Sequence, residues 1–364
     1  MANSTQTYKA KKLFTGNEWL TNHAVQVSVG KITAIIPSTD VTGEVIDCDI
    51  LAPAFIDIQI YGAYGKLLSV YPETDSLHKL YAYCSAGGAS HFQPTVATND
   101  AAVFHQCVDA VKAYWKEGGK GCIGLHVEGP WISKAKKGAH LERFIHSPSV
   151  EEARSLLEYG KDVIKMITIA PEVCSREVID LIHSYGVIIS AGHSNATYEE
   201  ATAAFDAGIP AATHLYNAMS PLQHRAPGVV GAVLDHNKVM ASVVPDGYHV
   251  DFSAIRIAKK IMKERLFVIT DAVTDTDSGP YPHQLNGDRY ESNGILSGSA
   301  LTMAKSVRNL VQHVGIELEE ALRMVSLYPA QVMQLSDKLG RIEKGYSACM
   351  VMLDEQLQVK EVAS

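Results

Sequence analysis

The chain has 364 residues, enough for one barrel of roughly 250 residues and a smaller accessory unit. Its 32 Lys and Arg residues against 40 Asp and Glu residues give a formal net charge of -8 with no basic run, which excludes a nucleic-acid partner. No stretch reaches the roughly 18 apolar residues of a membrane span, and the first residues lack the apolar region of a signal peptide, so we expect a cytoplasmic protein with no membrane partner.

Both ends of the chain contain segments that are typical of β-strands. Residues 24–29 and 31–36 alternate apolar and polar positions near the N-terminus, and residues 348–353 and 357–359 are strand-like near the C-terminus, with Asp354 and Glu355 as a polar turn between them. The two ends can therefore pair. We expect residues 1–50 and 340–364 to form one small β-sandwich domain.

Between the two ends, short apolar runs bounded by turn residues alternate with stretches of helical periodicity, a pattern typical of parallel strands joined by helices. The apolar runs span residues 55–60, 91–95, 123–127, 165–169, 187–191, 212–214, 240–244 and 267–270. Helices are predicted at residues 101–116, 150–159, 175–185, 198–207 and 253–263, and again at 301–313 and 318–325. We predict an α/β fold, with a (β/α)8 TIM-type barrel over residues 51–339. Residues 275–298, rich in Gly, Asp, Asn and Ser, are expected to form a long loop over its mouth.

Polar residues directly follow several of the predicted strands, where the active site of such a barrel lies. Glu128 follows the third run, His193 the fifth and Asp271 the eighth, and His214 stands at the end of the sixth. One such residue alone would more often be a capping or solvated group, but the recurrence at successive strand ends indicates a site. One carboxylate and two imidazoles suit a divalent metal with an open position for water. The six cysteines contain no CxxC pair, so a Cys-type zinc site or a disulfide framework is not suggested.

Five segments carry a resemblance to a known family. They are PAFIDIQ at residues 53–59, HVEGP at 126–130, GHS at 192–194, THLYNAM at 213–219 and LSGS at 296–299. Together they resemble the N-acetylglucosamine-6-phosphate deacetylase family of the amidohydrolase superfamily, with similarity from about residue 50 to residue 353. The resemblance implies hydrolysis of N-acetyl-D-glucosamine 6-phosphate to D-glucosamine 6-phosphate and acetate, a step of amino sugar metabolism. The expected partner is this small amino sugar phosphate.

The resemblance also implies roles for individual residues. Glu128, His193 and His214 match the metal ligands, Asp271 matches the catalytic aspartate, and His140 is expected to help polarise the acetyl carbonyl. The implied substrate contacts are Ala139, His140, Asn217, Ala218, Arg225, His249, Leu296, Ser297 and Gly298. Arg225 and His249 are associated with the 6-phosphate. Arg225 is expected to reach the site of a neighbouring subunit, which implies a homodimer.

The end of the first predicted strand differs from many amidohydrolases, which have a His-x-His pair there that holds a second metal. This chain has Gln59 and Tyr61 instead. A neutral amide is a poor ligand beside an imidazole, and a tyrosine would have to lose a proton with an unperturbed pKa of about 10. We therefore expect one divalent metal ion per subunit: zinc, with iron, cobalt or manganese as alternatives. Asp271 is suited to accept a proton from water activated by that ion and to return it to the departing amine.

Two alternatives remain open at this point. The same chemistry could act on the galactosamine epimer or on another small amide, because the choice of epimer depends on one hydroxyl group. A protein of a different class, a silent amidohydrolase relative used as a scaffold, would be expected to lack metal ligands or the catalytic acid. Glu128, His193, His214 and Asp271 are all present, which argues against the scaffold.

Overall fold

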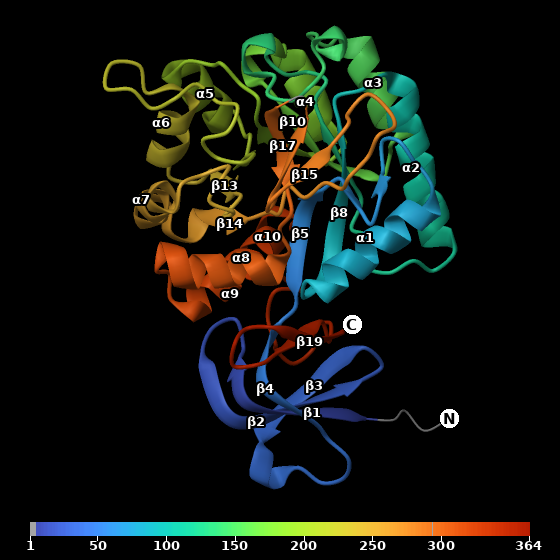
Figure 1. The fold of residues 1–364 in the computed structure, drawn as a ribbon, viewed down its shortest axis with the longest axis vertical. Coiled ribbons are helices and arrows are strands. Elements are labelled where there is room, and N and C mark those ends of the chain that lie inside the picture. Colours follow the sequence, from blue (N-terminus) through green and yellow to red (C-terminus); the bar gives the residue numbers. More distant parts are fainter. Residues whose placement is uncertain (1–4, 293) are drawn as a thin grey trace.

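The computed structural model describes residues 5–292 and 294–364, which form a barrel and a smaller β unit at one end of it (Figure 1). The β unit is a six-stranded sheet in the order β19-β18-β4-β1-β2-β3, so both ends of the chain contribute to it as expected. Its strands are β1 (Gln6–Phe14), β2 (Trp19–Ser28), β3 (Lys31–Pro37), β4 (Ile46–Pro53), β18 (Met350–Leu353) and β19 (Val359–Ala363).

This small sheet curls around a core of its own. The segment that leads into β18 bonds to the opposite edge of the sheet, because Gly345 N–H donates to the Ile32 carbonyl at 2.8 Å and Ala348 N–H to the Gly30 carbonyl at 3.0 Å. Apolar side chains of this curled sheet, such as Leu13 and Val25, are fully buried. The sheet therefore has a core of its own, while other residues of its strands, such as Phe14 and Val351, belong to the core of the barrel.

Eight parallel strands form the barrel, which confirms the predicted architecture. They are β5 (Phe55–Ile60), β8 (Ala89–Ala97), β9 (Leu125–Glu128), β10 (Ile164–Ile169), β11 (Ile188–Ala191), β12 (Ala211–Ala212), β13 (Met240–Val243) and β14 (Leu266–Val268). The ring closes just beyond its first and last strands, where Tyr61 N–H donates to the Ala272 carbonyl at 2.9 Å and Asp271 N–H to the Gln59 carbonyl at 3.0 Å. This closure brings the ends of the first and eighth strands side by side.

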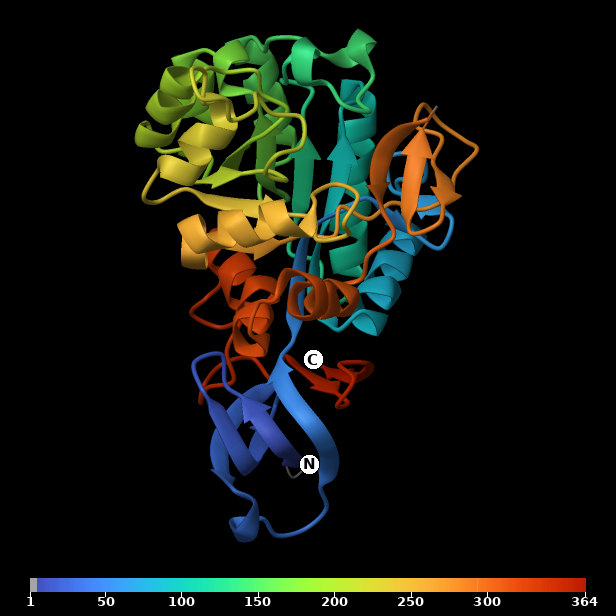
Figure 2. The same ribbon diagram turned by 60° about the vertical axis from the view of Figure 1, so that its left-hand side comes forward.

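Helices cover the outside of the barrel (Figures 1 and 2). They are α1 (Thr74–Ala86), α2 (Ala101–Lys116), α3 (Val150–Tyr159), α4 (Arg176–Ser184), α5 (Tyr198–Asp206), α6 (Gly228–Asp235), α7 (Phe252–Met262), α8 (Met303–Asn309), α9 (Leu318–Val325) and α10 (Leu327–Val332). Helix α2 begins where Asp100 accepts a hydrogen bond from Val103 N–H, and it buries Phe104, Val108 and Val111 on one face. Among the described residues, no helix is both long enough and apolar enough to cross a membrane.

The segment after the eighth strand is more ordered than the loop that the sequence predicts. It contains a three-stranded antiparallel sheet made of β15 (Gln284–Asn286), β16 (Arg289–Ser292) and β17 (Ile295–Ser299). These strands are only three to five residues long and largely polar, so they lack the apolar alternation by which a strand is predicted. The small sheet lies beside the barrel strands in Figure 2, and a short hairpin of β6 (Gly62–Ala63) and β7 (Lys66–Leu67) follows β5.

Candidate metal and active site

Three side chains from three strand ends bring their donor atoms together at the mouth of the barrel. Glu128 ends β9, and His193 and His214 follow β11 and β12. Glu128 Oε1 lies 3.4 Å from His193 Nε2 and 3.2 Å from His214 Nε2, and the two Nε2 atoms are 3.1 Å apart. Ligand atoms at about 2.0–2.1 Å from a tetrahedral ion lie about 3.3 Å from one another. The three atoms are thus already spaced as the edges of such a coordination shell, and the residues fit a divalent metal.

Hydrogen bonds hold the imidazole of His193 and the backbone of His214 in place. His193 Nδ1 lies 2.9 Å from the Lys136 carbonyl, to which it can only donate, so the ring leaves Nε2 free as a ligand. The backbone N–H of His214 donates to Ser242 Oγ at 2.7 Å. The φ angle is +49° at His193, +38° at His214 and +55° at Asp271. Positive φ is uncommon outside glycine, and such backbone strain occurs often at functional sites.

The ionisation of these groups suits cation binding. Burial alone would raise the pKa of Glu128, but the close imidazoles of His140, His193 and His214 outweigh it and hold the pKa well below the usual range. Burial lowers the pKa of His193 to about 4, so this ring is neutral and its lone pair is available. Burial opposes protonation of His214, but Glu128 raises its pKa overall. The negative charge that favours a proton on His214 equally favours a metal ion in its place.

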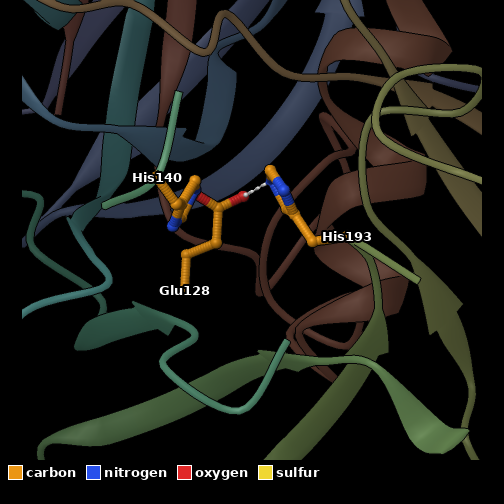
Figure 3. Close-up of side chains that lie close together, drawn as sticks. All are labelled: Glu128, His140 and His193. Carbon is orange, nitrogen blue, oxygen red and sulfur yellow. Dashed lines mark hydrogen bonds and ion pairs between the residues drawn. The ribbon is translucent and has the colours of Figure 1, made fainter. Parts of the chain in front are cut away.

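His140 offers a different contact to the same carboxylate. Figure 3 shows Glu128 between His140 and His193, and these three residues also lie close enough together to hold an ion. His140 Nε2 lies 3.1 Å from Glu128 Oε2, the oxygen that faces away from the other two imidazoles, and His140 Nδ1 lies 2.6 Å from Thr98 Oγ1. Because His193 and His214 meet on Oε1, we favour His214 over His140 as the third ligand.

Asp271 stands beside this cluster at the end of the eighth strand. Its Oδ1 accepts a hydrogen bond from Gln59 Nε2 at 2.9 Å, and its Oδ2 lies 3.7 Å from His249 Nε2. The other nitrogen of His249 is held by Asp246 Oδ2 at 2.6 Å. Burial raises the pKa of Asp271, although the nearby imidazoles of His214 and His249 oppose the shift. A carboxyl group with a raised pKa is better able both to accept and to return a proton near neutral pH.

One cavity contains the cluster, Asp271 and most of the predicted substrate contacts. Among those contacts, the residues that line it are Ala139, His140, Asn217, Ala218, His249, Leu296 and Ser297. Gly298 and Arg225 are absent from its lining within the described chain. Gly298 instead lets the backbone approach its neighbours, because a Cβ there would lie 2.6 Å from Val273 Cγ1. Arg225 lies exposed in the loop between β12 and α6.

The cavity also has walls that sequence reasoning missed, namely Leu67, Ser69, Ala97, Gly138, Val273, Tyr281 and His283. The Tyr281 hydroxyl donates to the Thr98 carbonyl at 2.5 Å, while Thr98 Oγ1 contacts His140. His283 Nδ1 lies 2.9 Å from Ser297 Oγ, and burial lowers the pKa of His283 to about 4. Both residues belong to the polar segment after the eighth strand, and its predicted place over the mouth was the only signal for them.

A closed eight-stranded barrel with two imidazoles and two carboxylates at its strand ends defines a metal-dependent hydrolase of the amidohydrolase class. Comparison with known proteins agrees, since the model of the Amidohydrolase family matches residues 50–363. The chain belongs to this family.

Two relatives and one solved structure are similar over nearly the whole chain. The N-acetylglucosamine-6-phosphate deacetylase of Haemophilus influenzae is 34% identical over 95% of this chain and 94% of its own. The N-acetylgalactosamine-6-phosphate deacetylase of Escherichia coli O157:H7 is 31% identical over 98% of this chain and 97% of its own. The crystal structure of N-acetylglucosamine-6-phosphate deacetylase from Pasteurella multocida is 35% identical, with a TM-score of 0.94 and coverage of 99% of this chain and 98% of that one.

Proposed function

We propose that the protein hydrolyses the acetamide of N-acetylglucosamine 6-phosphate to glucosamine 6-phosphate and acetate. The observation that carries this proposal is the arrangement of Glu128, His193, His214 and Asp271 around one cavity, in a chain similar over its full length to enzymes of that name. A scaffold without activity would have no need for a carboxylate of raised pKa beside a set of metal-spaced donors.

The residues around the cavity have separable tasks in this reaction. Glu128, His193 and His214 would hold the ion, which supplies Lewis-acid polarisation of the amide and lowers the pKa of water when bound. Asp271 accepts the proton of the attacking water and then delivers it to the amine nitrogen, which could not leave as an anion. His140, which lines the cavity and whose Nδ1 lies 2.6 Å from Thr98 Oγ1, is placed to help polarise the acetyl carbonyl.

The donor set supports zinc as the ion, with iron, cobalt and manganese as alternatives. Two imidazoles and one carboxylate leave an open position, as in catalytic zinc sites. One ion per subunit is proposed, because the end of β5 presents Gln59 and Tyr61. Loading the purified protein with excess zinc and counting metal per chain by elemental analysis tests this, and two tightly held ions would contradict it.

Recognition of the phosphate is proposed to combine His249 with Arg225 of a second subunit. His249 lines the cavity, whereas Arg225 lies exposed and does not line the cavity of its own chain. A guanidinium supplies the local positive charge that a net charge of -8 does not provide. The homodimer that this implies, and the cytoplasmic location expected from the sequence, stay predictions.

A second candidate is the same hydrolysis on the galactosamine epimer, because a deacetylase of that substrate is 31% identical to this chain. The test is acetate release from N-acetylglucosamine 6-phosphate and from N-acetylgalactosamine 6-phosphate, each with and without a chelator. We expect a higher kcat/KM on the glucosamine substrate and loss of both activities with the chelator. A preference for the galactosamine substrate would replace the first proposal by the second.

A further inference from the structure

Gln59 and Tyr61 lie at the end of β5 between the two carboxylates of the site. Both side chains are buried, with 2% and 8% exposed. Gln59 Nε2 lies 2.9 Å from Asp271 Oδ1, 3.1 Å from Glu128 Oε1 and 2.8 Å from the Tyr61 hydroxyl. The Tyr61 hydroxyl lies 2.5 Å from Glu128 Oε2. The two side chains thus connect the proposed metal ligand with the proposed base.

The directions of these hydrogen bonds follow from the chemistry of the partners. Ionised carboxylates only accept, so the amide nitrogen of Gln59, and not its oxygen, faces Glu128 and Asp271. One of its two hydrogens serves Asp271, and the other points to the Tyr61 hydroxyl and Glu128 Oε1. The Tyr61 hydroxyl accepts from Gln59, so its single hydrogen is free to be donated to Glu128 Oε2.

We propose that Gln59 and Tyr61 are positioning residues that take the place of a second cation, with their hydrogen-bond donors holding Glu128 and Asp271 together. Two buried carboxylates that both lie within 3.1 Å of one amide nitrogen repel each other unless a cation or hydrogen-bond donors lie between them. Their N–H and O–H groups provide those donors without a net charge. Gln59 and Tyr61 thereby occupy the two positions at which a His-x-His pair would stand.

Tyr61 also affects the proposed site of the single metal ion, through its contact with Glu128. Glu128 Oε2 receives the Tyr61 hydroxyl at 2.5 Å and lies 3.1 Å from His140 Nε2. Both of these contacts are on the oxygen that His193 and His214 do not share. Glu128 is therefore held so that it offers Oε1 alone to the ion. This inference rests on the proposed metal ligands but not on the identity of the substrate.

The first test replaces Tyr61→Phe, which removes one hydroxyl and keeps the ring. We expect the dissociation constant for zinc, measured by competition with a chromophoric chelator in the absence of substrate, to rise about 10–100-fold, as for other partners of metal ligands. Tyr281→Phe is the matched control, because it removes a buried hydroxyl of the same cavity that bonds to the Thr98 carbonyl instead. Near-UV circular dichroism verifies that both variants fold.

The second test introduces a His-x-His pair at the end of β5 by the double substitution Gln59→His and Tyr61→His. Elemental analysis after zinc loading should give two ions per chain in this variant and one in the wild type. A zinc dissociation constant for Tyr61→Phe within twofold of the wild-type value, or two ions in the wild type, would overturn the proposal. Because these readouts need no substrate, a protein that shows them but releases no acetate would refute the proposed function and leave this inference standing.

Discussion

Replacing Asp271 by asparagine removes a proton acceptor and one negative charge from the cavity while the side chain keeps its shape. The asparagine oxygen can still accept the hydrogen bond that Gln59 Nε2 gives to Asp271 Oδ1 at 2.9 Å. The cavity and the spacing of Glu128, His193 and His214 should therefore be preserved. The substitution isolates the chemical role of the carboxylate from its role in packing.

The size of the effect follows from the surroundings of Asp271. A general base contributes about 10²–10⁴-fold, or about 3–5 kcal/mol of the activation barrier. We expect the upper end of this range, because the same carboxyl group would serve both proton transfers and the two described neighbours that could replace it, Glu128 and His249, are engaged in other contacts. Glu128 is occupied by its contacts to Tyr61 and three imidazoles, and His249 is fixed by Asp246 at 2.6 Å.

The assay is acetate release at saturating zinc, with metal content measured on the same samples. For Asp271→Asn we expect kcat to fall about 10⁴-fold, with bound zinc and KM for N-acetylglucosamine 6-phosphate changed little. Wild-type activity should rise as the pH rises through the raised pKa of Asp271, because the base acts in its ionised form. A decrease in kcat of less than 10-fold at full zinc occupancy would refute the assigned role.

Arg225→Ala should raise KM for the phosphorylated substrate about 10–100-fold and leave the unphosphorylated sugar little changed, and equal losses on both would argue against a phosphate contact. His140→Asn should lower kcat about 10²–10³-fold with zinc retained, whereas His214→Asn should lose zinc; the reverse pattern by elemental analysis would exchange their roles. Burial raises the pKa of Asp57 to about 7, against hydrogen bonds from Thr270, so the folded protein retains a proton that the unfolded chain has released above about pH 4. Stability should therefore fall as the pH rises from about 4 to 7, by at most about 1.4 kcal/mol per pH unit, and Asp57→Asn should remove this slope. Urea unfolding at several pH values measures it, and parallel slopes for the two proteins would contradict the argument.

The barrel could be predicted because each strand is a short apolar run between turn residues. Residues 55–60 were predicted as a strand and are β5, and residues 101–116 were predicted as a helix and are α2, where Asp100 supplies the N-cap. The strands β15 to β17 could not be predicted in this way. They are short and largely polar, and they form because they pair with each other at the mouth of the barrel.

The sequence predicted only those residues of the candidate site whose positions follow from the order of the strands. Glu128, His193 and His214 meet because the carboxyl ends of parallel strands lie at one end of a barrel. The contacts of Tyr281 and His283 depend on how a long irregular segment folds back over the mouth, which no local pattern encodes. The link from Gln59 to Asp271 depends on the closure of the barrel between its first and last strands, 212 residues apart in the chain.

The most direct test of the account is acetate release by metal-free protein during titration with zinc. Protein stripped with a chelator should release no acetate from N-acetylglucosamine 6-phosphate, and activity should return linearly until one equivalent of zinc per chain is bound. Undiminished activity in the stripped protein, or no acetate release from protein that holds its zinc, would contradict the assignment of a metal-dependent deacetylase.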